Sequence, residues 1–216
     1  MKSKRTTQPE REPGFLLRLH QERKEAIRTR LAEFQAVPPR QYFYELAFCL
    51  MTPQSSAEHA DRVARNLQLL RFEQTGIDPE PILGQRDQYI RFHRTKARHL
   101  LLARDQIDLI GRAVGNGFAP AQLREWLVAN VKGLGLKEAT HFLRNIGKSD
   151  GLAILDRHIL RNLRRFGIIR SVPQSLTRKR YLSIEKKFNR FAETIGIPAG
   201  ELDLLFWSME TGEIRK

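Results

Sequence analysis

Apolar side chains recur along this chain at the spacing of α-helices. From Phe15 to Phe34 they return every three or four residues between charged ones, which predicts an amphipathic helix that ends before Pro38-Pro39. The same periodicity predicts four further helices with defined ends, one from residue 40 to the break before Pro53 and the others over residues 120–130, 156–166 and 181–195. It also predicts the starts of three others, at about residue 57, at about residue 91 and within residues 201–212. No stretch of useful length alternates between apolar and polar residues, so the predicted fold class is all-α.

The net charge of the chain indicates what kind of partner it binds. Lysine and arginine outnumber aspartate and glutamate by 38 to 24, which leaves a net charge of +14. Such an excess favours a polyanionic partner, and nucleic acid before membrane, because no apolar run approaches the roughly 20 residues of a membrane span. Residues 1–14 are charged, lack periodicity and are expected to form a disordered basic tail.

The cysteine count restricts the chemistry. Cys49 is the only cysteine, which excludes an intramolecular disulfide, a cysteine-rich zinc site and a four-cysteine iron–sulfur cluster. His141 and His158 do not stand at metal-ligand spacing, and we expect no metal held by side chains and no cofactor. Backbone carbonyls in the turn within residues 131–139 are an alternative site for a monovalent or divalent cation. The N-terminus lacks the apolar core of a signal peptide, and we expect a monomeric cytoplasmic protein that is associated with the nucleoid.

The stretch from Val131 to Ala139 joins two predicted helices through a turn that contains Gly133 and Gly135. Glycines permit a tight turn, and the amides that open the second helix can bind a phosphate at its positive dipole end. Lys132 adds a possible phosphate contact. A turn of this kind grips a DNA backbone without reading its sequence, although any tight helical hairpin shares the pattern.

Two ionisable residues accompany the turn. Lys137 follows Gly135 by two residues, and Asp156 lies 19 residues further on, in an apolar setting. A lysine amine can attack a sugar carbon and form a Schiff base if it is neutral, which burial or nearby cations favour. Alternatively, Lys137 is an ordinary surface lysine and Asp156 is the N-cap of the helix over residues 156–166; capping and catalysis are compatible for an aspartate in this position.

With this lysine and aspartate behind a double-glycine turn, the chain resembles the helix-hairpin-helix superfamily of DNA glycosylases. It departs from the usual hairpin pattern at Lys132, where a proline is common. More narrowly, it resembles the archaeal-type 8-oxoguanine DNA glycosylase/lyase family over about residues 40–216. The stretches that carry this are Thr52-Pro53-Gln54-Ser55, Arg91-Phe92-His93, the hairpin through Leu160, and the ending Phe206 to Lys216.

The resemblance implies two packed helical subdomains with the active site in the cleft between them. Residues 40–115 are expected to form one subdomain, and residues 15–39 with 116–216 the other, which carries the hairpin at 126–147 and the catalytic region at 137–156. It also implies a bifunctional DNA repair enzyme of base excision repair, which excises 8-oxoguanine from double-stranded DNA through a Schiff base on Lys137 and nicks the strand by β-elimination. Asp156 then stabilises positive charge on the sugar.

Four further residues are expected to contact the substrate. Lys216 is expected in the pocket for the oxidised base, as the family ends on such a lysine, and Trp207 offers a stacking face, although a tryptophan on an apolar helix is more often core. Gln54 and Phe92 are candidates for filling the gap that a flipped nucleotide leaves. The alternative for Gln54 is a turn-capping role, and the alternative for Phe92 is a place in the core. Basic residues surround Phe92 at the predicted helix start: Arg91, His93, Arg94, Lys96, Arg98 and His99.

Rival functions differ in what they require. An endonuclease III-like glycosylase for oxidised pyrimidines is the closest, but most of these carry a four-cysteine cluster that Cys49 alone cannot supply. An adenine glycosylase needs a carboxylate within residues 46–54, where the chain has none. A non-catalytic helix-hairpin-helix module would grip DNA without needing Lys137 or Asp156.

Overall fold

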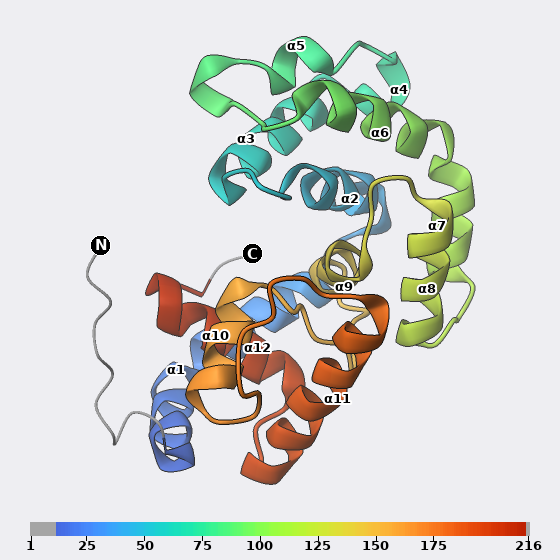
Figure 1. The fold of residues 1–216 in the computed structure, drawn as a ribbon. Coiled ribbons are helices and arrows are strands. Elements are labelled where there is room, and N and C mark those ends of the chain that lie inside the picture. Colours follow the sequence, from blue (N-terminus) through green and yellow to red (C-terminus); the bar gives the residue numbers. More distant parts are fainter. Residues whose placement is uncertain (1–11, 215–216) are drawn as a thin grey trace. The chain divides into compact units, whose positions relative to one another are not determined.

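The structure, a computed structural model, describes residues 12–214, and within this range the regular elements are helical (Figure 1). This confirms the all-α prediction. The elements are α1 (Pro13–Gln35), η2 (Pro39–Gln41), α2 (Tyr42–Met51), α3 (Ala57–Leu69), α4 (Phe72–Thr75), α5 (Glu80–Leu83), η3 (Arg86–Gln88), α6 (His93–Asp105), α7 (Ile107–Gly115), α8 (Pro120–Asn130), α9 (Leu136–Asn145), α10 (Arg157–Arg165), α11 (Arg178–Ile195) and α12 (Ala199–Thr211). Residues 1–11 of the predicted tail and Lys216 lie outside the described residues. No described helix is long and apolar enough to cross a membrane.

The chain divides into two compact units. One comprises residues 1–34 and 149–216, and the other residues 35–148. In this division α8 and α9 group with the helices that precede them, because α9 packs on α2 as well as on α8. Lys137 and Asp156 therefore belong to different units.

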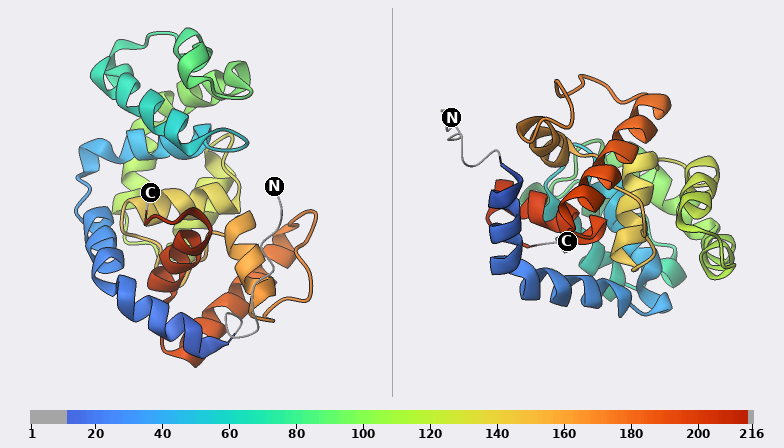
Figure 2. Two further views of the ribbon diagram at one scale, coloured as in Figure 1. Left: turned by 90° about the vertical axis from the view of Figure 1, so that its left-hand side faces the viewer. Right: turned by 90° about the horizontal axis from the view of Figure 1, so that it is seen from below.

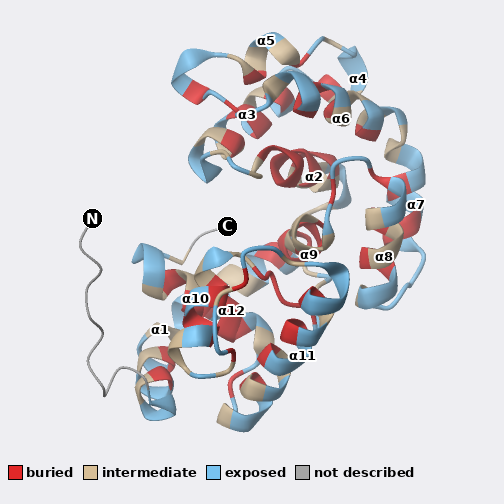
Figure 3. Ribbon diagram, in the orientation of Figure 1, coloured by how far each residue is buried: buried red, intermediate tan, exposed pale blue. Residues whose placement is uncertain are grey.

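In the unit of residues 35–148, α2 is the buried centre. All but two of its ten residues are buried, and α3, α6 and α9 pack against it (Figure 3). A helix that is apolar on every side must be covered on every side, so α2 fixes the positions of its neighbours. It ends at Met51, before Pro53, and α3 begins at residue 57 after the N-cap Ser56, whose Oγ accepts a hydrogen bond from His59 N.

In the unit of residues 1–34 and 149–216, α12 lies between α1 and α10 (Figure 2). Its Phe206 is fully buried and stacks on Phe166, with ring centroids 5.7 Å apart. Polar contacts tie α1 to it: His20 Nε2 donates to Glu201 Oε2 at 2.5 Å, and Arg28 Nε donates to Glu201 Oε1 at 3.0 Å. Burial alone would raise the pKa of Glu201, but the hydrogen bonds from His20 and Arg28 outweigh it and leave that pKa below its usual value.

Candidate active site

The turn between α8 and α9 requires one of its two glycines. Gly133 has a φ of +95°, and a Cβ at that position would come within 2.4 Å of His99 Nδ1 on α6. Only glycine satisfies both the backbone conformation and the approach of the His99 ring. Gly135 has an ordinary φ of −96°, so its conformation is open to other residues, but a Cβ there would meet Glu138 Oε2 at 3.1 Å.

The start of α9 has the properties of an anion site. Gly135 is its N-cap, and no described side chain accepts a hydrogen bond there, which leaves the first helical amides available. Lys132 is exposed on the turn. Burial lowers the pKa of His99, and the positive charge of Lys132 lowers it further. The turn therefore combines open backbone N–H groups with positive charge, the combination that binds phosphate.

Lys137 lies in the first turn of α9 and is accessible. Its side chain is 36% exposed, and its Nζ lies 3.0 Å from Oε1 of Glu138, which is itself 14% exposed. The amine therefore has an acid beside it and an open side through which a substrate can approach.

Lys96, on α6, is the charged residue of this region to which the sequence assigns no role of its own. It is only 5% exposed, and its Nζ donates to Met51 O and Pro53 O at 2.6 Å and to Ser55 Oγ at 3.0 Å. Burial lowers its pKa to about 8; Glu138 acts in the opposite direction and Lys137 in the same one. The available signal was its spacing of four residues from Leu100, which places it on the buried face of α6 rather than among the exposed basic residues.

Gln54 and Phe92 share an unusual backbone. Their φ angles are +56° and +60°, a left-handed region that residues with side chains adopt at a cost of about 1–3 kcal/mol. Both are exposed. Phe92 is 51% exposed beneath the guanidinium of Arg91, so the core alternative for it is wrong. The N-cap of α3 is Ser56, two residues after Gln54.

Asp156 is held by three donors. Its Oδ1 accepts hydrogen bonds from the backbone N–H groups of His158 and Ile159, each at 2.8 Å, and its Oδ2 accepts one from Trp207 Nε1 at 3.2 Å. Asp156 is therefore the N-cap of α10, as the capping interpretation predicts. Trp207 on α12 is partly exposed, and its ring lies edge-on to that of His158, with centroids 5.8 Å apart.

The candidate residues fall into two groups. Within residues 35–148 the structure gathers those of the turn and its surroundings: Gln54, Phe92, Lys132, Gly133, Gly135 and Lys137. Asp156 and Trp207 form the second group, in the other unit. Lys216 lies outside the described residues. Among residues 12–214, no group of three or more histidine, cysteine, aspartate or glutamate side chains could hold a metal.

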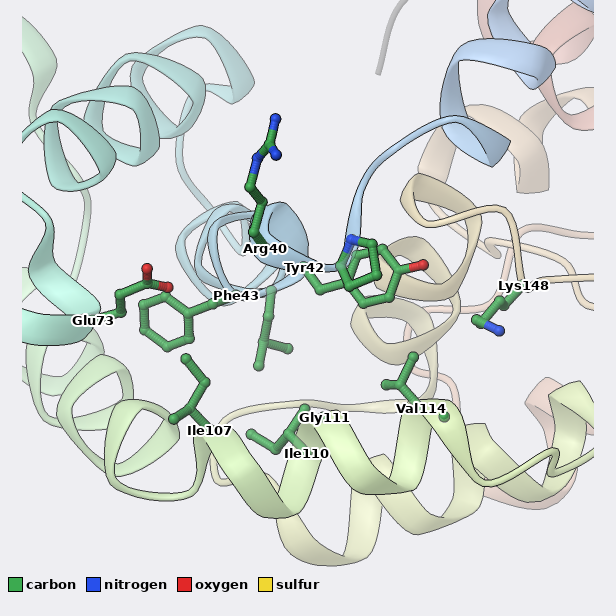
Figure 4. A pocket seen from close by; sticks show the side chains of 12 residues that line it. Arg40, Tyr42, Phe43, Glu73, Ile107, Ile110, Gly111, Val114 and Lys148 are labelled. Carbon is green, nitrogen blue, oxygen red and sulfur yellow. The ribbon is translucent and has the colours of Figure 1, made fainter.

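A cavity of about 340 Å³ in the unit of residues 35–148 contains none of these candidates (Figure 4). It lies between α2 and α7, with Phe43, Leu46 and Ile110 among its lining residues, and Glu73 and Lys148 at its edges. This apolar space is separate from the polar, basic surface of the hairpin.

Comparisons with known proteins agree on one family. A family model described as 8-oxoguanine DNA glycosylase matches residues 27–197. A Fusobacterium nucleatum protein named 8-oxoguanine DNA glycosylase/AP lyase is 37% identical over 92% of this chain and 95% of its own. The crystal structure of the Thermotoga maritima 8-oxoguanine DNA glycosylase is 34% identical, with a TM-score of 0.81, and covers 94% of this chain and 98% of that one. A second crystal structure is that of the Methanocaldococcus jannaschii 8-oxoguanine glycosylase/lyase in complex with a 15mer DNA containing 8-oxoguanine. Its chain is 32% identical, with a TM-score of 0.82, and the match covers 94% of this chain and 100% of that one.

Proposed function

Because the chain belongs to the 8-oxoguanine DNA glycosylase family, we propose that it is a DNA glycosylase/AP lyase that removes 8-oxoguanine from double-stranded DNA and nicks the strand. The observation that carries this function is similarity, over nearly the whole chain, to proteins of that name. The net charge of +14 suits a DNA substrate. We also propose that the protein works in the cytoplasm at the nucleoid, where such a substrate lies.

The turn between α8 and α9 grips the DNA backbone in this proposal. The open amides at the start of α9 bind a phosphate, Lys132 contributes a charge, and the lack of side chains at Gly133 and Gly135 lets the strand approach closely. These contacts position the DNA and carry no information about the damaged base.

Lys137 is the proposed nucleophile. Its neutral amine attacks C1′ of the damaged nucleotide, the bond from C1′ to the base nitrogen breaks, and the base leaves with that electron pair. Loss of a proton from the nitrogen and opening of the sugar then yield a Schiff base. Removal of a C2′ proton expels the 3′ phosphate and nicks the strand. Glu138 Oε1 lies 3.0 Å from the amine, within reach for proton transfer during these steps.

Asp156 is proposed to stabilise the positive charge that develops on the same sugar as the base departs. Its three hydrogen-bond donors support the role, because they fix the position and direction of the carboxylate. We further propose that Trp207 and Lys216 contribute to the pocket for the extruded base, with Trp207 as a stacking surface.

Gln54 and Phe92 are proposed to fill the gap that the extruded nucleotide leaves. Flipping a base out of the duplex costs a few kcal/mol, which inserted side chains offset by restoring stacking. Their exposure and their left-handed backbone support this role, because strain of this kind is retained mainly where a function needs it.

A panel of duplexes tests the function. The panel contains 8-oxoguanine, an oxidised pyrimidine such as 5-hydroxycytosine, an abasic site or no damage, and base release and strand cleavage are measured separately. We expect release from the 8-oxoguanine duplex and cleavage of that duplex and of the abasic one. Faster release of the oxidised pyrimidine would favour the endonuclease III-like alternative. Salt-sensitive binding without lesion preference or nicking would favour a non-catalytic module.

A further inference from the structure

We propose that Lys96 is a positioning residue that holds Gln54 and Phe92 in one fixed arrangement for insertion into DNA. The inference rests on the proposed gap-filling role of these two residues, which lie 38 positions apart in the chain. It assigns to the buried ammonium of α6 a function that is distinct from phosphate binding.

Three acceptors converge on the Lys96 ammonium from the loop that carries Gln54. Met51 O belongs to the last turn of α2, where helix carbonyls lack intrahelical partners. Pro53 O and Ser55 Oγ belong to the residues immediately before and after Gln54. An ammonium has three hydrogens, so this set uses its full capacity. Gln54 is therefore fixed on both sides by one cation.

Ser55 extends the arrangement to Phe92. Its hydroxyl oxygen accepts from Lys96 Nζ at 3.0 Å and also from the backbone N–H of Arg91 at 3.0 Å, which uses both of its lone pairs. The backbone N–H of Lys96 donates to Phe92 O at 3.0 Å. That backbone bond opens α6 and does not depend on the lysine side chain, so the ammonium acts on Phe92 through the Ser55 hydroxyl and the neighbouring Arg91.

A lysine here carries a desolvation penalty. An apolar side chain of the same length would avoid that penalty but would leave Met51 O and Pro53 O without this donor. The lowered pKa of Lys96, about 8, reflects this penalty. The ammonium fixes the geometry of the loop, because it donates hydrogen bonds to three groups at once. We infer that it thereby maintains the left-handed backbone conformations of Gln54 and Phe92, which are unfavourable in isolation. Glu138 and Lys137 are the charged groups that act on it, so the arrangement adjoins the proposed nucleophile.

Single-turnover release of 8-oxoguanine tests the proposal. Lys96→Met keeps the apolar stem and removes the ammonium, while Lys187→Met makes the same change at an exposed position on α11. We expect Lys96→Met to slow release roughly tenfold, the scale of one lost charged hydrogen-bonded group, and Lys187→Met to leave it unchanged. Fluorescence of a 2-aminopurine next to the lesion should rise less on binding of Lys96→Met than on binding of wild type, because insertion is impaired.

A double-mutant cycle separates positioning from an independent effect. If Lys96 acts through Gln54, Lys96→Met combined with Gln54→Ala releases the base no more slowly than the slower single variant. Defects that multiply would overturn the proposal, as would wild-type rates for Lys96→Met. If thermal melting shows that Lys96→Met does not fold, Ser55→Ala replaces it in the same cycle and is judged by the same outcomes. Failure of the proposed function is distinguishable, because wild type itself would then release no 8-oxoguanine.

Discussion

Replacing Gly133 by alanine should destabilise the protein more than the same change at Gly117 or Gly111. Its φ of +95° costs an alanine about 1–2 kcal/mol. The new Cβ would also lie 2.4 Å from His99 Nδ1 and 2.9 Å from its Cγ, and relief of such overlap in a packed site costs about 1–3 kcal/mol. Together these terms predict a loss of roughly 2–5 kcal/mol in the free energy of unfolding.

The two other glycines separate the terms. Gly117 has a φ of +70°, and nothing lies within 4 Å of the position that an alanine Cβ would take, so Gly117→Ala should show the conformational term alone, about 1–2 kcal/mol. Gly111 lies inside α7 with open space around it, so Gly111→Ala should stabilise by about 0.4–1 kcal/mol. Urea denaturation, followed by two probes to check two-state behaviour, measures all three. If Gly133→Ala costs no more than Gly117→Ala, the close approach of His99 to the turn is refuted.

Three further predictions concern charged groups. The pKa of Lys96 falls from 10.5 to about 8 on folding, so between these values the unfolded state binds more protons. The stability of wild type relative to Lys96→Met should therefore rise with pH over this range, by up to about 3 kcal/mol. Urea titrations at several pH values measure this, and a fall with pH would mean that folding raises the pKa of Lys96 instead. The pKa of Glu201 is lowered on folding, so its contribution to the free energy of unfolding is present above the ordinary pKa of 4.5 and is lost in acid. The stability of wild type relative to Glu201→Gln should therefore shrink as the pH falls below that value. A difference in denaturation midpoints that stays constant with pH would contradict this. Asp156→Asn keeps the Oδ1 cap but turns an amide N–H₂ toward Trp207 Nε1, so we expect a loss of about 1 kcal/mol in the free energy of unfolding. DNA binding should be nearly unchanged and base release slower. Unchanged single-turnover rates would count against the proposed role.

The sequence predicts local features of this fold well. The helix over Pro120–Asn130 is observed with the predicted bounds, and the one predicted over residues 156–166 is α10 with its cap and C-cap residues included. These elements carry their own signals, namely a proline at the first turn of the former and an aspartate at the cap of the latter. The turn between α8 and α9 was predictable for the same reason.

Features that depend on distant packing were not predictable. The burial of Lys96 follows from the position of the loop after α2, 43 residues before it, and that loop's carbonyls give no sequence signal. The left-handed conformation of Phe92 likewise depends on contacts across the chain, since phenylalanine has no local preference for it. The unit boundary near residue 148 follows from the packing of α9 on α2, which the helical periodicity of neither segment reveals.

Borohydride trapping on a duplex with one 8-oxoguanine tests the proposed role of Lys137 most directly, because reduction converts a Schiff base into a stable covalent adduct. The matched variants are Lys137→Gln and Lys187→Gln, the latter at an exposed lysine on α11. We predict that wild type and Lys187→Gln form the adduct and that Lys137→Gln does not. No adduct with wild type, or trapping of Lys137→Gln as efficient as that of wild type, would contradict the account.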